Sequence, residues 1–404
     1  MKPGEGRAVL HAFGWFFCVL SSYYVLRPLR EAMGIVGHVK DLSRLFLVTL
    51  AATLVLSPLL AAVVSRWPRR RFVPIVYRFF ALNLVVFFFL LRGASVHPTV
   101  ARAFFVWTSV FNLFALSLFW GLLADLFRRD QGVRLFGLIG AGGTAGAMIG
   151  SSVTALLAER IGIAPLVLVS AALLELAVQL VQRLVRLFGD SATPEGSPDP
   201  ALRQGGVLRW LPALLKNPYL LAIIAYMLLF TFTSTSVYFE QARIVKSTVS
   251  SNAARTALFA KMDLVVNLLS LGVQSLLVGR LLRRFGVGLT LALFPVMSVG
   301  GFLVLGASPT LTVIVVFQVL RRAADYGIAK PTREVLFTTV RREDKYKAKS
   351  FIDTFVYRAG DAIGALAEGA FAGSASVVLL VSVPVCIAWT AVSVLLGRMQ
   401  RPAG

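Results

Sequence analysis

Charged side chains lie inside long apolar stretches of this sequence, where each of them is costly. Placing an arginine, lysine or aspartate at the centre of a membrane helix costs roughly 2.5–3.5 kcal/mol on insertion scales. In SSYYVLRPLREAMG, a helical turn of about 100° per residue places Tyr23, Arg27 and Arg30 within about 60° of one another, with Tyr24 beside them. Because guanidinium groups bind phosphate through two parallel hydrogen bonds, this face predicts an anion site.

A second basic face lies near residue 330. On the same helical period, Tyr326, Lys330 and Arg333 fall within about 80° of Arg322. Tyrosine rings such as Tyr23 and Tyr24 offer a surface on which a base or ring can stack. Together the two faces favour an organic phosphate over a sugar or a cation.

Two further stretches combine acids with bases. Residues 214–243 carry Glu240 and Arg243 on one polar helix face. Residues 345–371 carry two acids, one base and one tyrosine, namely Asp353, Asp361, Arg358 and Tyr357. The structural alternative is that such residues snorkel from helix ends or form ion pairs that only hold helices together. The pairs considered are Lys330 with Glu334 and Arg321 with Asp325.

The composition indicates an all-α integral membrane protein. Of 404 residues, 57% are hydrophobic and only 15% are charged, which is too apolar for soluble domains. Apolar stretches of about 20 residues, the length of a membrane-spanning helix, recur along the whole chain. We therefore predict twelve spans, at 9–29, 44–65, 72–92, 101–126, 133–158, 163–187, 214–243, 255–282, 287–306, 309–340, 345–371 and 376–397.

The rarer residues exclude other classes of protein. The two cysteines and three histidines are too few and too scattered for a disulfide scaffold or a metal cluster, so we expect no metal and no cofactor. No nucleophile stands with a base, which argues against an enzyme. The net charge of +22 is spread in short clusters between apolar stretches, so nucleic acid is not an expected partner. These clusters fall in the even-numbered loops and both tails, which predicts cytoplasmic termini.

The chain divides into two similar halves. GDSATPEGSPDP lies near the middle, so we predict a six-helix bundle at 1–190, a cytoplasmic linker at 191–207 and a second bundle at 208–404. An offset of about 214 residues aligns three features: Arg66, Arg69 and Arg70 with Arg280, Arg283 and Arg284; Arg128 with Arg342; and AGAMIG from Ala145 with AGDAIG from Ala359. Two parallel six-helix repeats are the major facilitator architecture, in which substrate binds between the halves near the midplane. Spans 1, 4, 7 and 10 line the cavity in that architecture.

A glycine-rich segment imitates a dinucleotide-binding turn. GLIGAGGTAG, from Gly137 to Gly146, has the glycine spacing but lies within a predicted span. We therefore interpret these glycines as small residues that let two helices approach closely.

Three motifs carry a family resemblance. YYVLRPLRE, YFEQAR and KPTREVLFTTVRREDKYKAKSFID resemble the ATP:ADP antiporter family, the nucleotide transporters of plastids and obligate intracellular bacteria. The resemblance implies roles in nucleotide exchange for Arg30, Glu240 and Arg333, with arginine where lysine is usual. In span 4, where that family typically carries an acid, this chain has Thr108, Ser109 and Asn112. The resemblance thus implies a divergent bacterial member whose substrate is ATP/ADP, another nucleotide or another phosphorylated anion.

The sequence therefore predicts a monomeric antiporter in the bacterial inner membrane that exchanges nucleotides or similar organic phosphates by alternating access. The residues expected to bind substrate are Arg27, Arg30, Glu240, Arg243, Arg322, Lys330, Arg333, Tyr23, Tyr24, Asn112 and Tyr326. Glu240 would pair with Arg243 or Lys261, and substrate would compete with that pair. The residues expected to couple or gate transport are Asp353, Arg358, Asp361, Lys261 and Asp263.

Two alternatives remain open. One is a proton-coupled organic anion transporter in which Asp353, Asp361, Asp263 or Glu175 titrates. The other, from a different class, is a membrane scaffold or lipid-handling protein that does not transport solute. Its function would be insensitive to changes at Arg30 and Arg333.

Overall fold

A computed structural model describes residues 5–37, 41–93, 96–188, 214, 216–340, 348–349, 351–370 and 375–400. All regular secondary structure in these ranges is helical. The predicted linker at 191–207 lies outside the described residues, as does the 341–347 part of the third motif.

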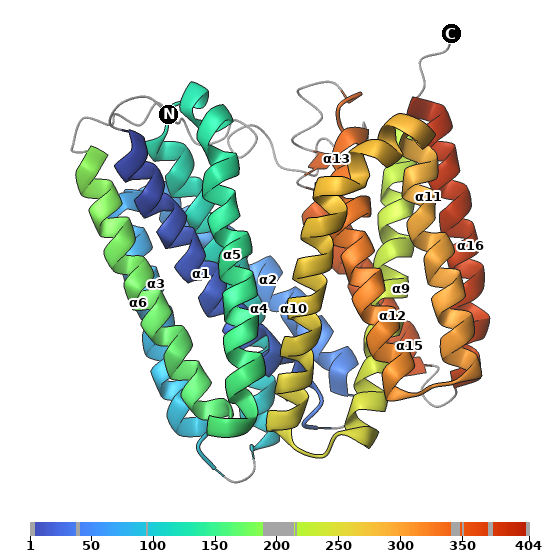
Figure 1. Ribbon diagram of the computed structural model, residues 1–404, viewed down its shortest axis with the longest axis horizontal. Helices are drawn as coiled ribbons and strands as arrows, with labels where there is room; N and C mark the ends of the chain where they lie inside the picture. The colour runs from blue at the N-terminus through green and yellow to red at the C-terminus, as the bar shows by residue number, and fades with distance from the viewer. Residues whose placement is uncertain are drawn as a thin grey trace. The chain divides into compact units, whose positions relative to one another are not determined.

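The first half of the chain forms six helices, close to the predicted spans: α1 (Glu5–Gly34), α2 (Asp41–Arg66), α3 (Arg69–Leu90), α4 (Pro98–Leu126), α5 (Arg129–Ile161) and α6 (Ile163–Phe188). Helix α1 packs against α4, α5 and α6, and α3 packs against α6 (Figure 1). Trp15 and Phe16 on α1 meet Phe119 on α4, with ring centroids 4.5 and 4.1 Å apart, which centres this half on an aromatic core.

The second half follows the same order of spans: α9 (Pro218–Thr248), α10 (Asn252–Leu276), α11 (Val278–Ala307), α12 (Leu311–Ala324), η1 (Asp325–Ala329), α13 (Lys330–Leu336), η2 (Ile352–Val356), α15 (Tyr357–Ala370) and α16 (Ala375–Gln400). Helix α9 packs against α12, α15 and α16, and α11 packs against α16 (Figure 1). Trp389 of α16 lies 5.0–5.8 Å, centroid to centroid, from the rings of Tyr226, Phe230 and Phe294.

Nine of the described helices are long and apolar enough to cross a membrane. The other three predicted spans correspond to α2, to α12 with η1 and α13, and to η2 with α15. The protein is therefore an all-helical integral membrane protein with twelve spans in two repeats, as the sequence predicts.

The packing of the glycines confirms both the repeat and its offset of about 214 residues. A Cβ atom at Gly146 would collide with the backbone of Phe17, and one at Gly360 would collide with Thr231, which is the residue one repeat after Phe17. Gly150 meets Ser21 in the same way that Gly364 meets Thr235. The glycine-rich segment therefore packs α5 onto α1, as interpreted from sequence, and its repeat packs α15 onto α9.

Three spans differ from the uninterrupted helices that were predicted. The span expected at 309–340 is broken by the π-helical segment η1 and its helix ends at Leu336, and the span expected at 345–371 contains a second such segment, η2. Helix α10 ends at Leu276 rather than at residue 282. The bend of α11 at Gly286, where φ is 72°, falls in the loop predicted between residues 282 and 287. Hydrophobic periodicity misses such breaks because the residues on both sides remain apolar.

Two compact units are present. The first comprises Met1–His38, Ala51–Asp199 and Val249–Leu264, and the second comprises Val39–Leu50, Pro200–Thr248 and Val265–Gly404. Helices α2 and α10 are thus each divided between the units. The predicted boundaries at 1–190, 191–207 and 208–404 stay a prediction.

The close glycine contacts generate a stability prediction. Gly146→Ala and Gly360→Ala should each lower the melting temperature of the purified protein, because overpacking typically costs about 1–3 kcal/mol. Gly140→Ala is the matched control, since nothing lies within 4 Å of a Cβ there. It should be neutral or stabilising, because alanine favours a helix over glycine. Equal melting temperatures for all three variants would contradict the packing described.

Candidate functional site

Arg30 is held at the end of α1 by neighbours of three kinds. Its Nε donates to Ser109 Oγ on α4 at 2.9 Å, and its Nη1 donates to Glu31 Oε1 at 2.7 Å. The guanidinium carbon lies 4.0 Å from the centroid of the Phe105 ring. Ser109 is one of the polar residues that stand in span 4 where the resembling family has an acid.

Arg27 forms an ion pair with Asp263 of α10, with 3.6 Å between Nη1 and Oδ1. Asp263 is buried, with 2% of its side chain exposed. The Arg27 guanidinium also lies 5.5 Å from the Tyr24 ring, which meets the Tyr23 ring edge to face at 5.5 Å. We call Arg27, Arg30, Glu31 and Asp263 the α1 cluster. Each of its two arginines has a carboxylate partner, so the cluster is neutral overall.

The second compact unit holds a different arrangement, which we call the α12 cluster: Arg321, Asp325 and Arg333. Arg333 Nη2 lies 3.6 Å from Asp325 Oδ1, and its guanidinium lies 4.9 Å from the Phe230 ring. Arg321 donates to the hydroxyls of Thr233 and Ser234, at 3.1 and 3.0 Å. The rings of Phe230 and Phe294 lie within 6 Å of Arg321, so aromatic faces surround both guanidinium groups.

The α12 cluster carries an excess of positive charge. Arg321 is only 4% exposed, and within the described part of the chain it has no carboxylate at ion-pair distance. Among the described residues, its Nε has no hydrogen-bond partner. The cluster therefore holds two arginines and one carboxylate, that of Asp325, which pairs with Arg333. Inside a membrane protein an uncompensated charge is costly.

The ion pairs of this region differ from those considered in the structural alternative. Asp325 pairs with Arg333 rather than Arg321, and Glu334 pairs with Lys349 at 2.5 Å rather than with Lys330. The π-helical segment η1 explains why Arg333 lies near Asp325 and Arg321. Arg321 and Arg333 would be about 120° apart on a regular helix, but a π-bulge adds about one residue and brings them within about 20°.

A third group combines two acids with one base. Arg243 Nη1 donates to Glu240 at 2.6 Å, and its Nη2 donates to Glu368 of α15 at 2.5 Å. Each glutamate side chain is 8% exposed and Arg243 is 27% exposed. We call Glu240, Arg243 and Glu368 the carboxylate triad. With both glutamates ionised, the triad has one more negative charge than positive.

Sequence reasoning missed Glu368 and Arg321. Glu368 stands alone in the small-residue segment ALAEGA, and an acid within an apolar span was a signal that could have found it. From the sequence, Arg321 is considered only as an ion-pair partner of Asp325. Only the π-helical register brings it to Arg333.

The remaining predicted site residues lie outside the two clusters and the triad. Arg322 and Tyr326 are half-buried on α12 and η1, and Asn112 is half-buried on α4. Three residues are exposed, namely Lys330 on α13, Asp353 on η2 and Lys261 on α10. Arg358 pairs with Asp361 at 3.6 Å, and Glu175 pairs with Arg78 at 3.0 Å where both are largely exposed.

Both π-helical segments adjoin predicted site residues. Tyr326 lies within η1 and Lys330 follows it directly, while Asp353 lies within η2 and Tyr357 follows it. Gly327 packs so closely on Val273 of α10 that a Cβ there would come within 2.8 Å of it. Such π-bulges occur frequently at functional sites, because they aim side chains that a regular helix would point elsewhere.

Comparison with known proteins places the fold. No protein-family model matches the sequence, and no curated protein matches it. Among solved structures, the chain is similar to a bacterial homologue of the iron transporter ferroportin in an inward-facing state, with a TM-score of 0.67, 14% identity and coverage of 98% of this chain and 99% of that one.

Two further solved structures are similar along their whole length. A bacterial homologue of the human lysosomal transporter Spinster has a TM-score of 0.63 at 14% identity, with 100% of both chains covered. The nucleoside transporter NupG has a TM-score of 0.59 at 16% identity, with 98% of both chains covered. The chain therefore has the major facilitator fold.

The charge of the carboxylate triad generates a second prediction. Arg243→Met should lower the melting temperature strongly, because losing one partner of a buried ion pair costs about 3–5 kcal/mol. Here the substitution leaves two carboxylates, Glu240 and Glu368, without their arginine. Glu368→Gln should cost much less, because it leaves the neutral pair Glu240–Arg243.

The control is Glu334→Gln, which breaks a pair whose acid is 53% exposed and should change the melting temperature little. If Glu368→Gln destabilises as much as Arg243→Met, the charge count of the triad is wrong.

Proposed function

We propose that this protein is an antiporter that exchanges nucleotides or similar organic phosphates by alternating access. The observation that carries the proposal is the charge of the α12 cluster, which holds two arginines, Arg321 and Arg333, and one carboxylate, Asp325, paired with Arg333. A bound anion would supply the negative charge that the cluster lacks. In a low-dielectric site that compensation is strong, and it is available only to a substrate of the right sign.

The type of basic residue supports a phosphate. Arginine presents a planar fork of donors that matches phosphate oxygens, and aromatic faces hold its plane in place. Phe230 and Phe294 support the arginines of the α12 cluster in this way, and Phe105 supports Arg30. Transporters of this fold include one for nucleosides and one related to an iron transporter. Two arginines per acid argue against a metal cation as cargo here.

The resemblance to the ATP:ADP antiporter family supports a nucleotide in particular. The three residues it implicates each lie in a different group: Arg30 in the α1 cluster, Arg333 in the α12 cluster and Glu240 in the carboxylate triad. Tyr23 and Tyr24 form an aromatic pair beside Arg27, on which a base can stack.

The carboxylate triad supports exchange rather than one-way transport. Arg243 is 27% exposed, so a phosphate can reach it and replace Glu240. The empty carrier keeps the Glu240–Arg243 pair, and breaking it without a substrate leaves a buried charge unpaired. Conformational change would then require a bound substrate on each passage, which makes exchange obligatory.

The orientation of the protein in the membrane is proposed from the distribution of basic residues among its loops. Basic residues between the predicted spans favour cytoplasmic termini. The family resemblance implies a bacterial inner membrane, and we propose a monomer as the working unit. These assignments belong to the proposal.

A proton-coupled anion transporter is the second candidate, and the carboxylate triad favours it. Two buried carboxylates on one guanidinium leave one negative charge that a proton can neutralise. Glu240 and Glu368 share one arginine, whereas Glu175 and Asp361 each have an arginine partner of their own.

Transport by reconstituted protein tests the main proposal. Uptake of labelled ATP into proteoliposomes should require internal ADP, and Arg333→Gln and Arg321→Gln should each reduce it at least tenfold, since a charge-assisted contact is worth about 1.5–3 kcal/mol. Arg44→Gln is the matched control, because Arg44 is 85% exposed. Full activity in both cluster variants would overturn the site, and a folded protein that transports no nucleotide would redirect the search to other phosphorylated anions.

Removal of the competing acid tests the exchange mechanism. Glu240→Gln should raise uptake into empty vesicles relative to uptake into ADP-loaded vesicles, because the empty carrier no longer has to break the Glu240–Arg243 pair. Unchanged dependence on internal ADP would contradict this mechanism. If a protonophore abolishes uptake and Glu368→Gln removes its dependence on a pH gradient, the proton-coupled candidate is correct instead.

A further inference from the structure

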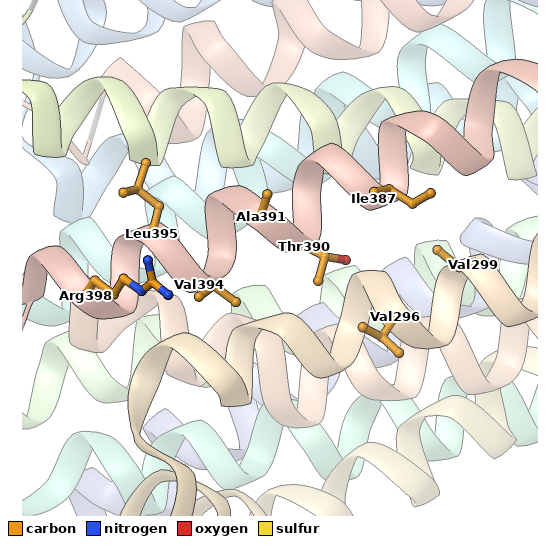
Figure 2. A pocket seen from close by; sticks show the side chains of 8 residues that line it. All are labelled: Val296, Val299, Ile387, Thr390, Ala391, Val394, Leu395 and Arg398. Atoms are coloured by element: carbon orange, nitrogen blue, oxygen red, sulfur yellow. The ribbon is translucent and has the colours of Figure 1, made fainter.

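A hollow opens between α11 and α16, within the second compact unit. It has a volume of about 620 Å³, and aliphatic side chains line most of it (Figure 2). Val296 and Val299 come from α11, while Ile387, Ala391 and Arg398 come from α16. Arg398 is the charged residue in the lining and marks one end of the hollow (Figure 2).

Close helix packing beside Arg398 fixes this end. A Cβ atom at Gly288 would lie 2.7 Å from the Cα of Gly397, so the two backbones touch there. Gly288 is near the start of α11 and Gly397 is near the end of α16, so the helices run antiparallel. Away from this contact the facing residues are Val296, Val299 and Ala391, which are too small to fill the space between the helices.

The walls of the hollow suit a hydrocarbon chain. Val296, Ile387 and Leu395 are 55%, 58% and 48% exposed, and both helices are candidate membrane spans. Thr390 Oγ1 donates to Cys386 O at 2.8 Å, so its hydroxyl is satisfied within its own helix. From Ile387 to Arg398, α16 rises about 16 Å, which is roughly half the hydrocarbon thickness of a bilayer. The hollow is therefore about as long as one leaflet is thick.

The charged end suits an anionic headgroup. Helices α11 and α16 contain no acidic residue, and the same end of the pair carries Arg280, Arg283 and Arg284 at the start of α11. Arg398 is exposed, and the described part of the chain shows no ion pair for it. Basic side chains beside spanning helices attract anionic lipids at the membrane surface.

The first half of the chain lacks this combination. One repeat earlier, Leu184 stands at the position of Arg398, Arg183 at that of Gly397 and Pro74 at that of Gly288. The first half thus has neither the glycine contact nor an arginine at the position of Arg398, although α6 carries Arg183 and Arg186.

We propose that the hollow between α11 and α16 binds one acyl chain of an anionic glycerophospholipid, whose phosphate contacts Arg398. Guanidinium binds a phosphodiester by charge-assisted hydrogen bonds, and the aliphatic walls take the chain down to the middle of the bilayer. The site is separate from the α12 cluster and the carboxylate triad, so the inference stands whether or not nucleotides are the substrate.

Photolabelling and lipid competition test this site on the full-length protein. Photoactivatable phosphatidylglycerol should label peptides of α11 and α16 that line the hollow. Native mass spectrometry should show preferential retention of phosphatidylglycerol over phosphatidylcholine. Arg398→Gln should reduce that preference about tenfold, while Arg66→Gln, an exposed cation at the end of α2, should leave it unchanged.

A variant that fills the hollow provides the second measurement. Ala391→Phe should reduce retention and photolabelling of both lipids, without loss of thermal stability. Labelling elsewhere, or retention that neither Arg398→Gln nor Ala391→Phe changes, would overturn the proposal. A change in oligomeric state with lipid retention intact would assign the hollow to a second copy of the chain instead.

Discussion

The cost of a charge in a membrane interior governs this structure. Each arginine inside a spanning helix requires a carboxylate, a hydroxyl or an aromatic face to offset its desolvation, and the three groups described meet that need to different degrees. Arg27 and Arg30 have acids of their own. Arg321 has hydroxyls and rings but no acid at ion-pair distance in the described chain. The charge that is least compensated is the one most available to a ligand.

The arginines of the α1 cluster and of the α12 cluster lie on helices that are not repeat counterparts of each other. An offset of about 214 residues puts Thr108, Asn112 and Phe119 of α4 at the positions of Arg322, Tyr326 and Arg333, so the first half has no counterpart of the basic face near residue 330. Conversely, Gln241 and Ile244 of α9 stand at the positions of Arg27 and Arg30. A common backbone therefore supports α1 arginines in one half and α12–α13 arginines in the other. The glycine contacts that build that backbone have been retained in both halves.

Within the second half, opposite charges lie along one face of α9. Thr233, which contacts Arg321, and Glu240, which belongs to the carboxylate triad, are two turns or about 10 Å apart on the same side of the helix. The α12 cluster lacks a negative charge and the triad has one to spare.

The sequence by itself determined the membrane class, the twelve spans, the repeat offset and the basic faces, because hydropathy, charge and small-residue spacing are local properties of the chain. It also identified the Glu240–Arg243 pair, since i and i+3 positions meet on any helix. Only the tertiary structure decided that Glu368 completes that pair and that Arg333 turns to Arg321 and Asp325. The first depends on a contact between helices far apart in sequence, and the second on a π-bulge that shifts the helical register. Neither leaves a periodic signal in the residues, because the first arises from packing between helices and the second from an interruption of the helical period.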